Sequence, residues 1–310
     1  MFVEFLIQLL LLIIGFALLV KGADYFVDGA CGIAGRFGIP QLIIGLTVVA
    51  MGTSAPEAAI SITAALKGSA DITIGNVVGS NILNVLLVLG ITAIIIPLAI
   101  GKSTFFIEIP FVIVITALLL GLGFDGVVSL VDGVILFIAF IIYLVYLFIS
   151  AKKSETEEGE EPIKWSLPVT LIITIAGLVC VIFGSNVTVD AATAIARLAG
   201  MSDRFIGLTI VAFGTSLPEL VTCVVAARKG SADIAIGNIV GSNIFNVLFV
   251  VSLSAFVIPI PFADAFRFDA IIATAVMVLL MLLSAKGRKL TRVGGIIMLV
   301  AYAAYFCKLL

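Results

Sequence analysis

GLTVVAMGTSAPE, at residues 45–57, occurs again as GLTIVAFGTSLPE at residues 207–219. Each copy is an apolar run that passes into small, hydroxyl-bearing and proline residues and closes on a glutamate, Glu57 or Glu219. A carboxylate in apolar surroundings is costly unless it is paired or coordinates a cation. Both glutamates therefore need a partner, and the rest of the chain indicates its chemistry.

The composition is that of a protein which crosses a lipid bilayer many times. The 310 residues are 62% hydrophobic and 12% charged, and the mean hydropathy is +1.34. Soluble domains are about half apolar and about a quarter charged. We therefore predict an all-α polytopic membrane protein. The sequence has no basic patch of the kind that binds nucleic acid. It also has no histidine, which excludes histidine metal sites and histidine proton relays.

Apolar runs of about 20 residues predict ten transmembrane helices. Their approximate bounds are 3–30, 39–66, 71–97, 104–123, 127–150, 166–196, 202–227, 233–259, 266–285 and 291–309. The clearly polar stretch 151–164 divides the chain into five-helix repeats at 1–150 and 165–310. This stretch lacks the ordered ligand spacing of a calcium loop, so a solvated linker is favoured over a calcium sensor.

The two halves align at a constant offset of 162, as between Glu57 and Glu219. KGSADITIGNVVGSN at 67–81 recurs as KGSADIAIGNIVGSN at 229–243, with only two substitutions. Five helices per half is an odd number, so the second half enters the membrane upside down. This is the inverted-repeat plan of secondary transporters, with the site near the midplane between the repeats.

The distribution of lysine and arginine predicts the orientation. With the N-terminus outside, twelve of the 17 basic residues fall on cytoplasmic ends and loops. The last loop is the clearest case, with Lys286, Arg288, Lys289 and Arg292. We therefore expect both termini outside and the 151–164 linker in the cytoplasm.

The repeated motif predicts a broken helix that carries a carboxylate. Gly52 and Pro56 both weaken a helix and release carbonyls around Ala50 to Thr53. Irregular backbone at membrane depth is tolerated where it lines a cavity or is buried in protein. Thr53 and Glu57 are four residues apart, which predicts a shared helical face. The second copy offers the same set from the opposite direction: Ala212, Thr215, Ser216, Pro218 and Glu219.

A polar stripe on the following helix extends this set of oxygens. Its residues lie at i, i+4 and i+8 and so share one face. They are Asn76, Ser80 and Asn84, repeated as Asn238, Ser242 and Asn246. Carboxylate, hydroxyl, amide and carbonyl oxygens without sulfur or imidazole suit hard cations. Two glutamates carry about −2, which one Ca²⁺ or several Na⁺ would offset.

The remaining repeated acids have simpler interpretations. Asp71 and Asp233 stand at the starts of predicted helices, where we expect them to act as N-terminal caps. Asp28 and its repeat counterpart Asp190 lie near the ends of predicted helices, where we expect solvation at the membrane interface. Glu57 and Glu219 are different, because an ionisable residue inside the membrane is a functional hypothesis by default and a copy in each half disfavours a structural role for both.

These motifs resemble those of the sodium/calcium exchanger family, within the cation/calcium antiporter superfamily. The resemblance rests on GTSAPE at 52–57, GTSLPE at 214–219 and the two GNxxGSN segments at 75–81 and 237–243. It covers essentially the whole chain. It implies a prokaryotic-type Na⁺/Ca²⁺ antiporter of the cell membrane, neither an enzyme nor dependent on a cofactor, that functions as a monomer by alternating access.

The resemblance also implies which residues bind the ions. Ca²⁺ would be held by the carboxylates of Glu57 and Glu219 and the carbonyls of Thr53 and Thr215. Na⁺ sites would share the glutamates and add Ala50, Ser54, Ser80, Asn84, Ala212, Thr215, Ser216, Ser242 and Asn246. The first and sixth helices are expected to slide across the other eight.

Two departures and three rival functions bear on this interpretation. Some relatives carry aspartate where this chain has Asn84 or Asn246, so dependence on potassium is disfavoured. The linker is too short for a calcium-sensing regulatory domain.

Ca²⁺/H⁺ exchange through the same glutamates is the alternative. A passive channel would need no counter-ion, and an intramembrane enzyme is disfavoured because its catalytic motifs are missing.

Overall fold

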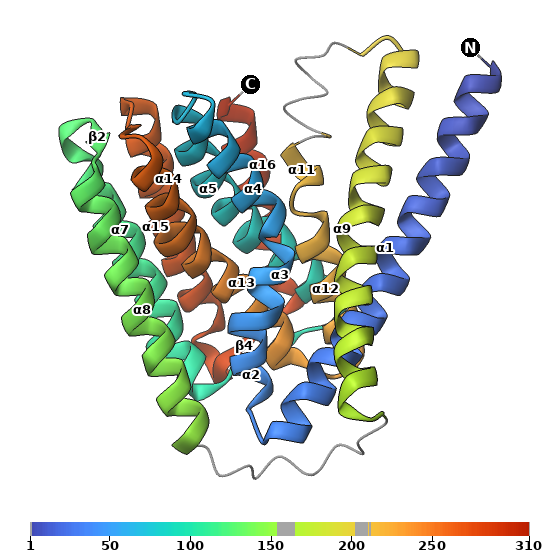
Figure 1. Ribbon diagram of the computed structural model, residues 1–310, viewed down its shortest axis with the longest axis horizontal. Helices are drawn as coiled ribbons and strands as arrows, with labels where there is room; N and C mark the ends of the chain where they lie inside the picture. The colour runs from blue at the N-terminus through green and yellow to red at the C-terminus, as the bar shows by residue number, and fades with distance from the viewer. Residues whose placement is uncertain (1, 154–164, 202–209, 211, 310) are drawn as a thin grey trace.

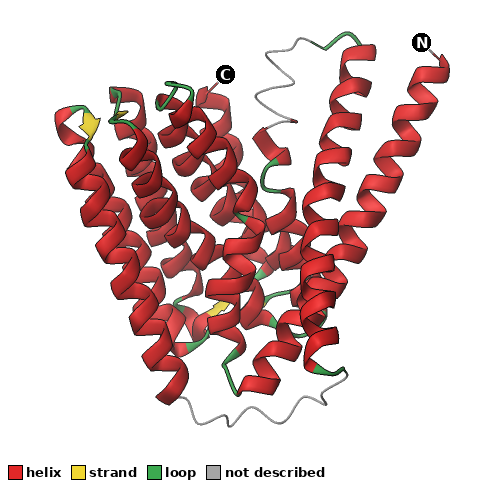
Figure 2. Ribbon diagram, viewed as in Figure 1, coloured by secondary structure: helices red, strands yellow, loops and turns green. Residues whose placement is uncertain are grey.

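The computed structural model describes residues 2–153, 165–201, 210 and 212–309, and this part is helical apart from two pairs of two-residue strands (Figures 1 and 2). Seven described helices are long and apolar enough to cross a membrane, and a bent pair of shorter helices makes an eighth candidate. The chain is therefore an all-helical, multi-pass membrane protein. The predicted span 202–227 lies partly outside the described residues.

The elements of the first part of the chain are α1 (Phe2–Phe37), α2 (Gln41–Ile44), η1 (Gly45–Val49), α3 (Ala50–Thr53), α4 (Ala55–Leu66), α5 (Asp71–Leu83), η2 (Asn84–Leu89), α6 (Gly90–Ile95), β1 (Leu98–Ala99), η3 (Thr104–Glu108), α7 (Ile109–Leu122), η4 (Gly123–Asp125), β2 (Val127–Val128) and α8 (Leu130–Lys153). The second part contains α9 (Leu167–Leu198), α11 (Ala212–Gly214), α12 (Leu217–Arg228), α13 (Ala232–Phe245), η6 (Asn246–Val250), α14 (Val251–Val257), β3 (Ile260–Pro261), α15 (Asp264–Ser284), η7 (Lys286–Arg288), β4 (Lys289–Leu290) and α16 (Arg292–Leu309).

The helix carrying the first motif breaks where the sequence predicts. Ser54 leaves helical geometry at φ −84° and ψ 7°, between α3 and α4, and the axis bends by 50°. Pro56 then starts α4, where its missing N–H is tolerated. The break separates Thr53 from Glu57, so the prediction that they share one continuous helical face is wrong. Ser216, at φ −95° and ψ 8°, marks the same break before α12.

Helices α1 and α9, which occupy equivalent positions in the repeat, run antiparallel in close contact. Gly15 lies against Gly184, and Gly22 lies against Gly177, so positions that advance along one helix retreat along the other. The two contacts are themselves related by the offset of 162. Small residues allow helix backbones to approach in this way. The pair stands on one side of the molecule, beside α11 and α12 (Figure 1).

The two strand pairs repeat the same relation. Leu98 of β1 pairs with Leu290 of β4, and Ile260 of β3 pairs with Val128 of β2. Adding 162 to Leu98 gives Ile260, and adding it to Val128 gives Leu290. The pairs lie towards opposite ends of the molecule (Figure 2). Equivalent segments of the two halves are thus found at opposite ends.

Helix α13 forms the centre of the packed interior. The segment Ala232–Val257, which continues from α13 through η6 and α14, is buried over most of its length. Any polar side chain on it therefore faces protein. The cap prediction for Asp71 and Asp233 is wrong, because the N-cap residues are Ala70 and Ser231 and neither makes a side-chain cap bond.

Gly177→Ala should destabilise the protein through the contact between α1 and α9. A Cβ at this position would lie 2.5 Å from the backbone nitrogen of Phe26. Overpacking of this kind costs about 1–3 kcal/mol, more than the up to about 1 kcal/mol gained from helix propensity. The midpoint of thermal unfolding in detergent measures the effect. Gly121→Ala in α7, where a Cβ meets nothing within 4 Å, is the control, and equal midpoints would contradict the close packing.

Candidate functional site

The two copies of the motif meet inside the protein. The hydroxyl of Ser54, at the first break, donates to Oε1 of Glu219 over 3.1 Å. Glu219 stands in the first turn of α12 and Glu57 in the first turn of α4. Both glutamates are completely buried. The carboxylate of one half is thus held by a hydroxyl from the other half.

Residues of α13 contact the backbone and side chains at the first break. Thr53 donates from Oγ1 to Oδ1 of Asn238 over 2.9 Å. Ser242 Oγ lies 3.5 Å from the carbonyl oxygen of Ala50, which also accepts from the backbone N–H of Ser54. Gly241 makes this approach possible, because a Cβ there would lie 2.6 Å from the carbonyl of Leu46. The carbonyl of Ala50 and the hydroxyl of Thr53 therefore lie beside the break, but the carbonyl of Ala50 keeps its hydrogen bond from the backbone N–H of Ser54 and is not released as predicted.

Four asparagines from the two halves form a reciprocal network. The side-chain nitrogens of Asn81 and Asn243 donate to each other's backbone carbonyl, over 3.2 and 3.3 Å. Asn84 donates to Oδ1 of Asn243, and Asn246 donates to Oδ1 of Asn81. Asn84 and Asn246 each begin a π-helical turn, η2 or η6, a feature frequent at functional sites. Their amide nitrogens are used, while their oxygens remain available.

Five buried acceptor oxygens around this junction have no hydrogen-bond donor. They are Oε1 and Oε2 of Glu57, Oε2 of Glu219, Oδ1 of Asn84 and Oδ1 of Asn246. Buried acceptors without a donor are costly. Carboxylate and amide oxygens of this kind are the ligands that hard cations prefer. No cluster of three or more Asp, Glu or Cys able to hold a metal ion occurs among the described residues, so such an ion would depend on amide, hydroxyl and carbonyl oxygens as well.

The sequence-predicted ligands mostly lie in the buried interior. Ser80, Ser216 and Ser242 are buried, and the hydroxyl of Ser216 has no hydrogen-bond partner. Thr215 is half-buried, in the second break. Ala212 begins α11, and its side chain lies outside the described residues. The contacts bring together Ala50, Thr53, Ser54, Glu219 and Ser242.

The predicted polar stripe agrees only in part with the asparagine network in the structure. Asn76 turns away from the asparagine network and donates to the carbonyl of Glu57 and the hydroxyl of Ser61. Asn81 and Asn243, in contrast, are central to that network although they lie off the i, i+4, i+8 stripe. Their position at the end of each GNxxGSN segment was the signal that could have identified them.

A third buried carboxylate, Glu108, was missed by the sequence analysis. It lies in η3 at the start of α7, and its Oε1 accepts from Ser103 over 2.7 Å and from Tyr146 over 3.0 Å. The signal was an acid inside the predicted span 104–123. Its repeat counterpart is Ala270, so Glu108 has no equivalent in the second half and does not belong to the duplicated site.

A cavity of about 280 Å³ lies between α4 and α9, and residues of both motifs contribute to its lining. Pro56, which precedes Glu57, and Thr215, four residues before Glu219, line it. Asp190, which is exposed, lines it as well. The cavity is therefore bounded both by residues of the two motifs and by the exposed Asp190.

Comparison with known proteins gives one consistent similarity. The family model described as "Sodium/calcium exchanger protein" matches residues 7–149 and 169–309. The chain is 31% identical to the sodium/calcium exchanger MaX1 of Methanosarcina acetivorans, over 96% of this chain and 97% of the relative. It is 38% identical to the inner membrane protein YrbG of Escherichia coli, over 80% and 79%. A structure of the sodium-calcium exchanger NCX_Mj soaked with 10 mM Na⁺ and zero Ca²⁺ matches 100% of both chains, with a TM-score of 0.86 at 34% identity.

Removal of one site carboxylate should abolish stabilisation by Ca²⁺. A ligand at 100 times its Kd stabilises a folded protein by about 2.7 kcal/mol, so Ca²⁺ should raise the midpoint of thermal unfolding of the purified protein. We expect this rise to be lost in Glu57→Gln and in Glu219→Gln, which each remove one charge from the unpartnered oxygens.

Glu108→Gln is the matched control, because Glu108 is equally buried but lies outside the duplicated site. It should keep the full rise with Ca²⁺. If all three variants responded to Ca²⁺ alike, the assignment of the site to Glu57 and Glu219 would be wrong.

Proposed function

The chain belongs to the sodium/calcium exchanger family, and from this premise we propose that it is a secondary antiporter that exchanges Na⁺ for Ca²⁺ across the membrane by alternating access. Members of the family are transporters rather than enzymes, and ion gradients drive them. The observation that supports the proposal most directly is the set of five unpartnered buried oxygens on Glu57, Glu219, Asn84 and Asn246.

We assign the two ions to overlapping ligand sets. Ca²⁺ is held by the carboxylates of Glu57 and Glu219 with the carbonyls of Thr53 and Thr215. Na⁺ uses the same glutamates together with the surrounding oxygens, from residues Ala50, Ser54, Ser80, Asn84, Ala212, Ser216, Ser242 and Asn246. The burial of all these residues except Thr215 and Ala212, and the contact from Ser54 to Glu219, support the assignment.

The shared carboxylates explain how the two fluxes are coupled. The glutamates carry a charge of about −2, which an apolar interior tolerates only when a cation offsets it. One Ca²⁺ or several Na⁺ can do so, but the same oxygens cannot bind both loads at once. The site therefore changes sides only when loaded, and Na⁺ moving down its gradient drives Ca²⁺ against its own. The relative NCX_Mj has been crystallised with Na⁺ and with Ca²⁺ or Sr²⁺.

We propose that ten transmembrane helices form two inverted five-helix repeats, at residues 1–150 and 165–310, joined by a cytoplasmic linker at 151–164. The antiparallel contact of α1 with α9 and the exchanged strand pairs support this arrangement. So does the separate match of the family model to 7–149 and 169–309. In a prokaryotic cell membrane, the excess of basic residues places both termini outside. A single chain contains the whole site, so it functions as a monomer.

Ca²⁺/H⁺ exchange is the second candidate, because the same two glutamates could alternate between a proton and Ca²⁺. The hydroxyl and amide oxygens around them favour Na⁺, since a proton would need only the carboxylates. A passive channel would use the same oxygens without coupling.

Imposed gradients in proteoliposomes separate these possibilities. We expect Ca²⁺ uptake when Na⁺ is loaded inside and diluted outside, and only background uptake with a K⁺ gradient or a pH gradient. Glu57→Gln and Glu219→Gln should reduce the Na⁺-driven uptake to the background of empty liposomes, whereas Glu108→Gln should keep it. Uptake driven by a pH gradient alone would favour Ca²⁺/H⁺ exchange, and uptake without any counter-gradient would indicate a channel.

A further inference from the structure

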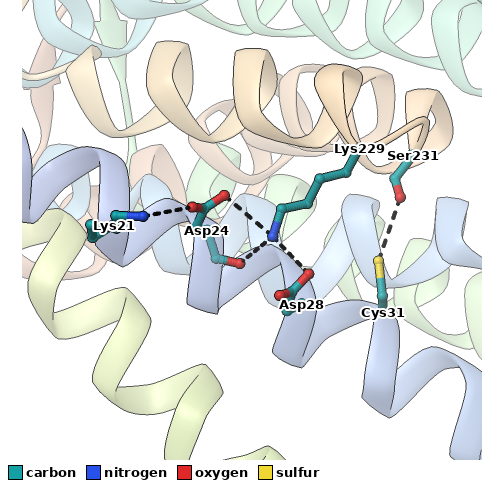
Figure 3. Close-up of polar contacts among 6 residues, drawn as sticks. All are labelled: Lys21, Asp24, Asp28, Cys31, Lys229 and Ser231. Atoms are coloured by element: carbon teal, nitrogen blue, oxygen red, sulfur yellow. Dashed lines mark hydrogen bonds and ion pairs between the residues drawn. The ribbon is translucent and has the colours of Figure 1, made fainter. Parts of the chain in front are cut away.

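A cluster of charged residues joins α1 to the turn between α12 and α13 (Figure 3). Lys229, at the end of α12, lies 2.7 Å from Oδ1 of Asp28 and 3.3 Å from Oδ1 of Asp24. Its ammonium also donates to the backbone carbonyl of Asp24 over 2.8 Å. One helical turn further on, Cys31 contacts Ser231 over 3.5 Å. The expectation that Asp28 is simply solvated is therefore wrong.

The repeat provides a second copy of this arrangement. Adding 162 to Asp28 gives Asp190 on α9, and Lys67 at the end of α4 is the counterpart of Lys229. Asp190 and Lys67 are both exposed. Neither has an ion pair or a hydrogen bond to its side chain within the part of the chain that the structure describes. One of the two equivalent ion pairs is thus formed and the other is not.

The packing beneath the two positions differs in the same way. On the formed side, α1 packs along α12, and the facing side chains are buried. On the other side, the equivalent helices α9 and α4 are separated by the 280 Å³ cavity. The contrast is clearest for Thr222, which is completely buried, and its counterpart Ile60, which is 41% exposed and lines the cavity.

Helices α1 and α9 link the two positions mechanically. Their glycine contacts hold the backbones together over several turns, so a shift of one carries the other. Asp28 lies in the C-terminal part of α1, and Asp190 lies in the C-terminal part of α9. Because the two helices are antiparallel, these aspartates lie towards opposite ends of the pair. A shift that brings Asp190 towards Lys67 therefore draws Asp28 away from Lys229.

We propose that Asp28–Lys229 and Asp190–Lys67 are alternative latches, each of which closes one side of the transporter while the other is open. The inference rests on the proposed antiport function and adds residues that decide which side the site faces. The structure represents the state with the first latch closed and the cavity at Asp190 open. In the opposite state, Lys67 binds Asp190 and α9 packs along α4, as α1 now packs along α12.

The reactivity of a cysteine in the cavity measures the balance between the two states. Asn186 lines the cavity and is exposed, so Asn186→Cys is labelled by an uncharged maleimide when this side is open. The reporter is placed in a chain with Cys180 and Cys307 replaced by serine, because Cys31 and Cys223 are buried. Labelling is measured at equilibrium in detergent and needs no transport.

The two lysines should shift labelling in opposite directions. Lys229→Gln removes the closed latch and should slow labelling about two- to fivefold, the range expected for a partly exposed ion pair. Lys67→Gln weakens the opposite state and should accelerate labelling. A role confined to the present structure predicts no effect of Lys67→Gln, because Lys67 has no partner among the described residues. Lys21→Gln is the control, because Lys21 reaches only Asp24 on its own helix.

Exchange of the charges, Asp28→Lys with Lys229→Asp, should restore labelling to the rate of the parent reporter. Unchanged labelling in both single variants, or a change in the same direction, would overturn the latches. The failure of the proposed function is a separate result: it would appear as absent Na⁺-driven Ca²⁺ uptake by the unmodified protein, whatever the labelling rates.

Discussion

Two buried carboxylates without enough donors govern this structure. An isolated charge in an apolar interior is unstable, so the fold must bring other oxygens to Glu57 and Glu219 and leave room for a cation. The breaks at Ser54 and Ser216 deliver hydroxyls and carbonyls to the same depth. The π-helical turns that begin at Asn84 and Asn246 add amide oxygens. A regular helix, with every carbonyl bonded within the segment, could not supply this set.

Sequence reasoning predicted the parts of the fold and site that depend on local chemistry. Pro56 and Gly52 located the break, and duplication of the motif indicated that the two halves meet, as the contact from Ser54 to Glu219 shows. Sequence reasoning failed where a side chain's partner lies far away in the sequence. Oε1 of Glu108 accepts from Tyr146, 38 positions away, and Asp28 binds Lys229, 201 positions away. No periodicity within one helix reports such contacts, because they depend on how the helices cross.

Asymmetry between nearly identical halves is the main structural result beyond the site itself. The segments 67–81 and 229–243 differ at only two positions, yet Lys229 is bound and Lys67 is exposed. The local sequence therefore does not explain why one lysine is bound and the other exposed. We attribute the difference to the position of the α1–α9 pair relative to α12 and α4. One sequence pattern supports both environments, which is what a protein with two exchangeable states of similar free energy requires.

The strand pairs have a consequence for how the two halves depend on each other. β1 pairs with β4 and β2 pairs with β3, so each ladder takes one strand from each half. Leu98 of the first half pairs with the repeat counterpart of Val128, and Val128 pairs with the repeat counterpart of Leu98. This reciprocal pairing is the geometry of an isologous dimer interface. In this chain both ladders are intramolecular. Either half alone would have two unpaired strand edges and a single buried carboxylate, so each half is structurally and chemically incomplete without the other.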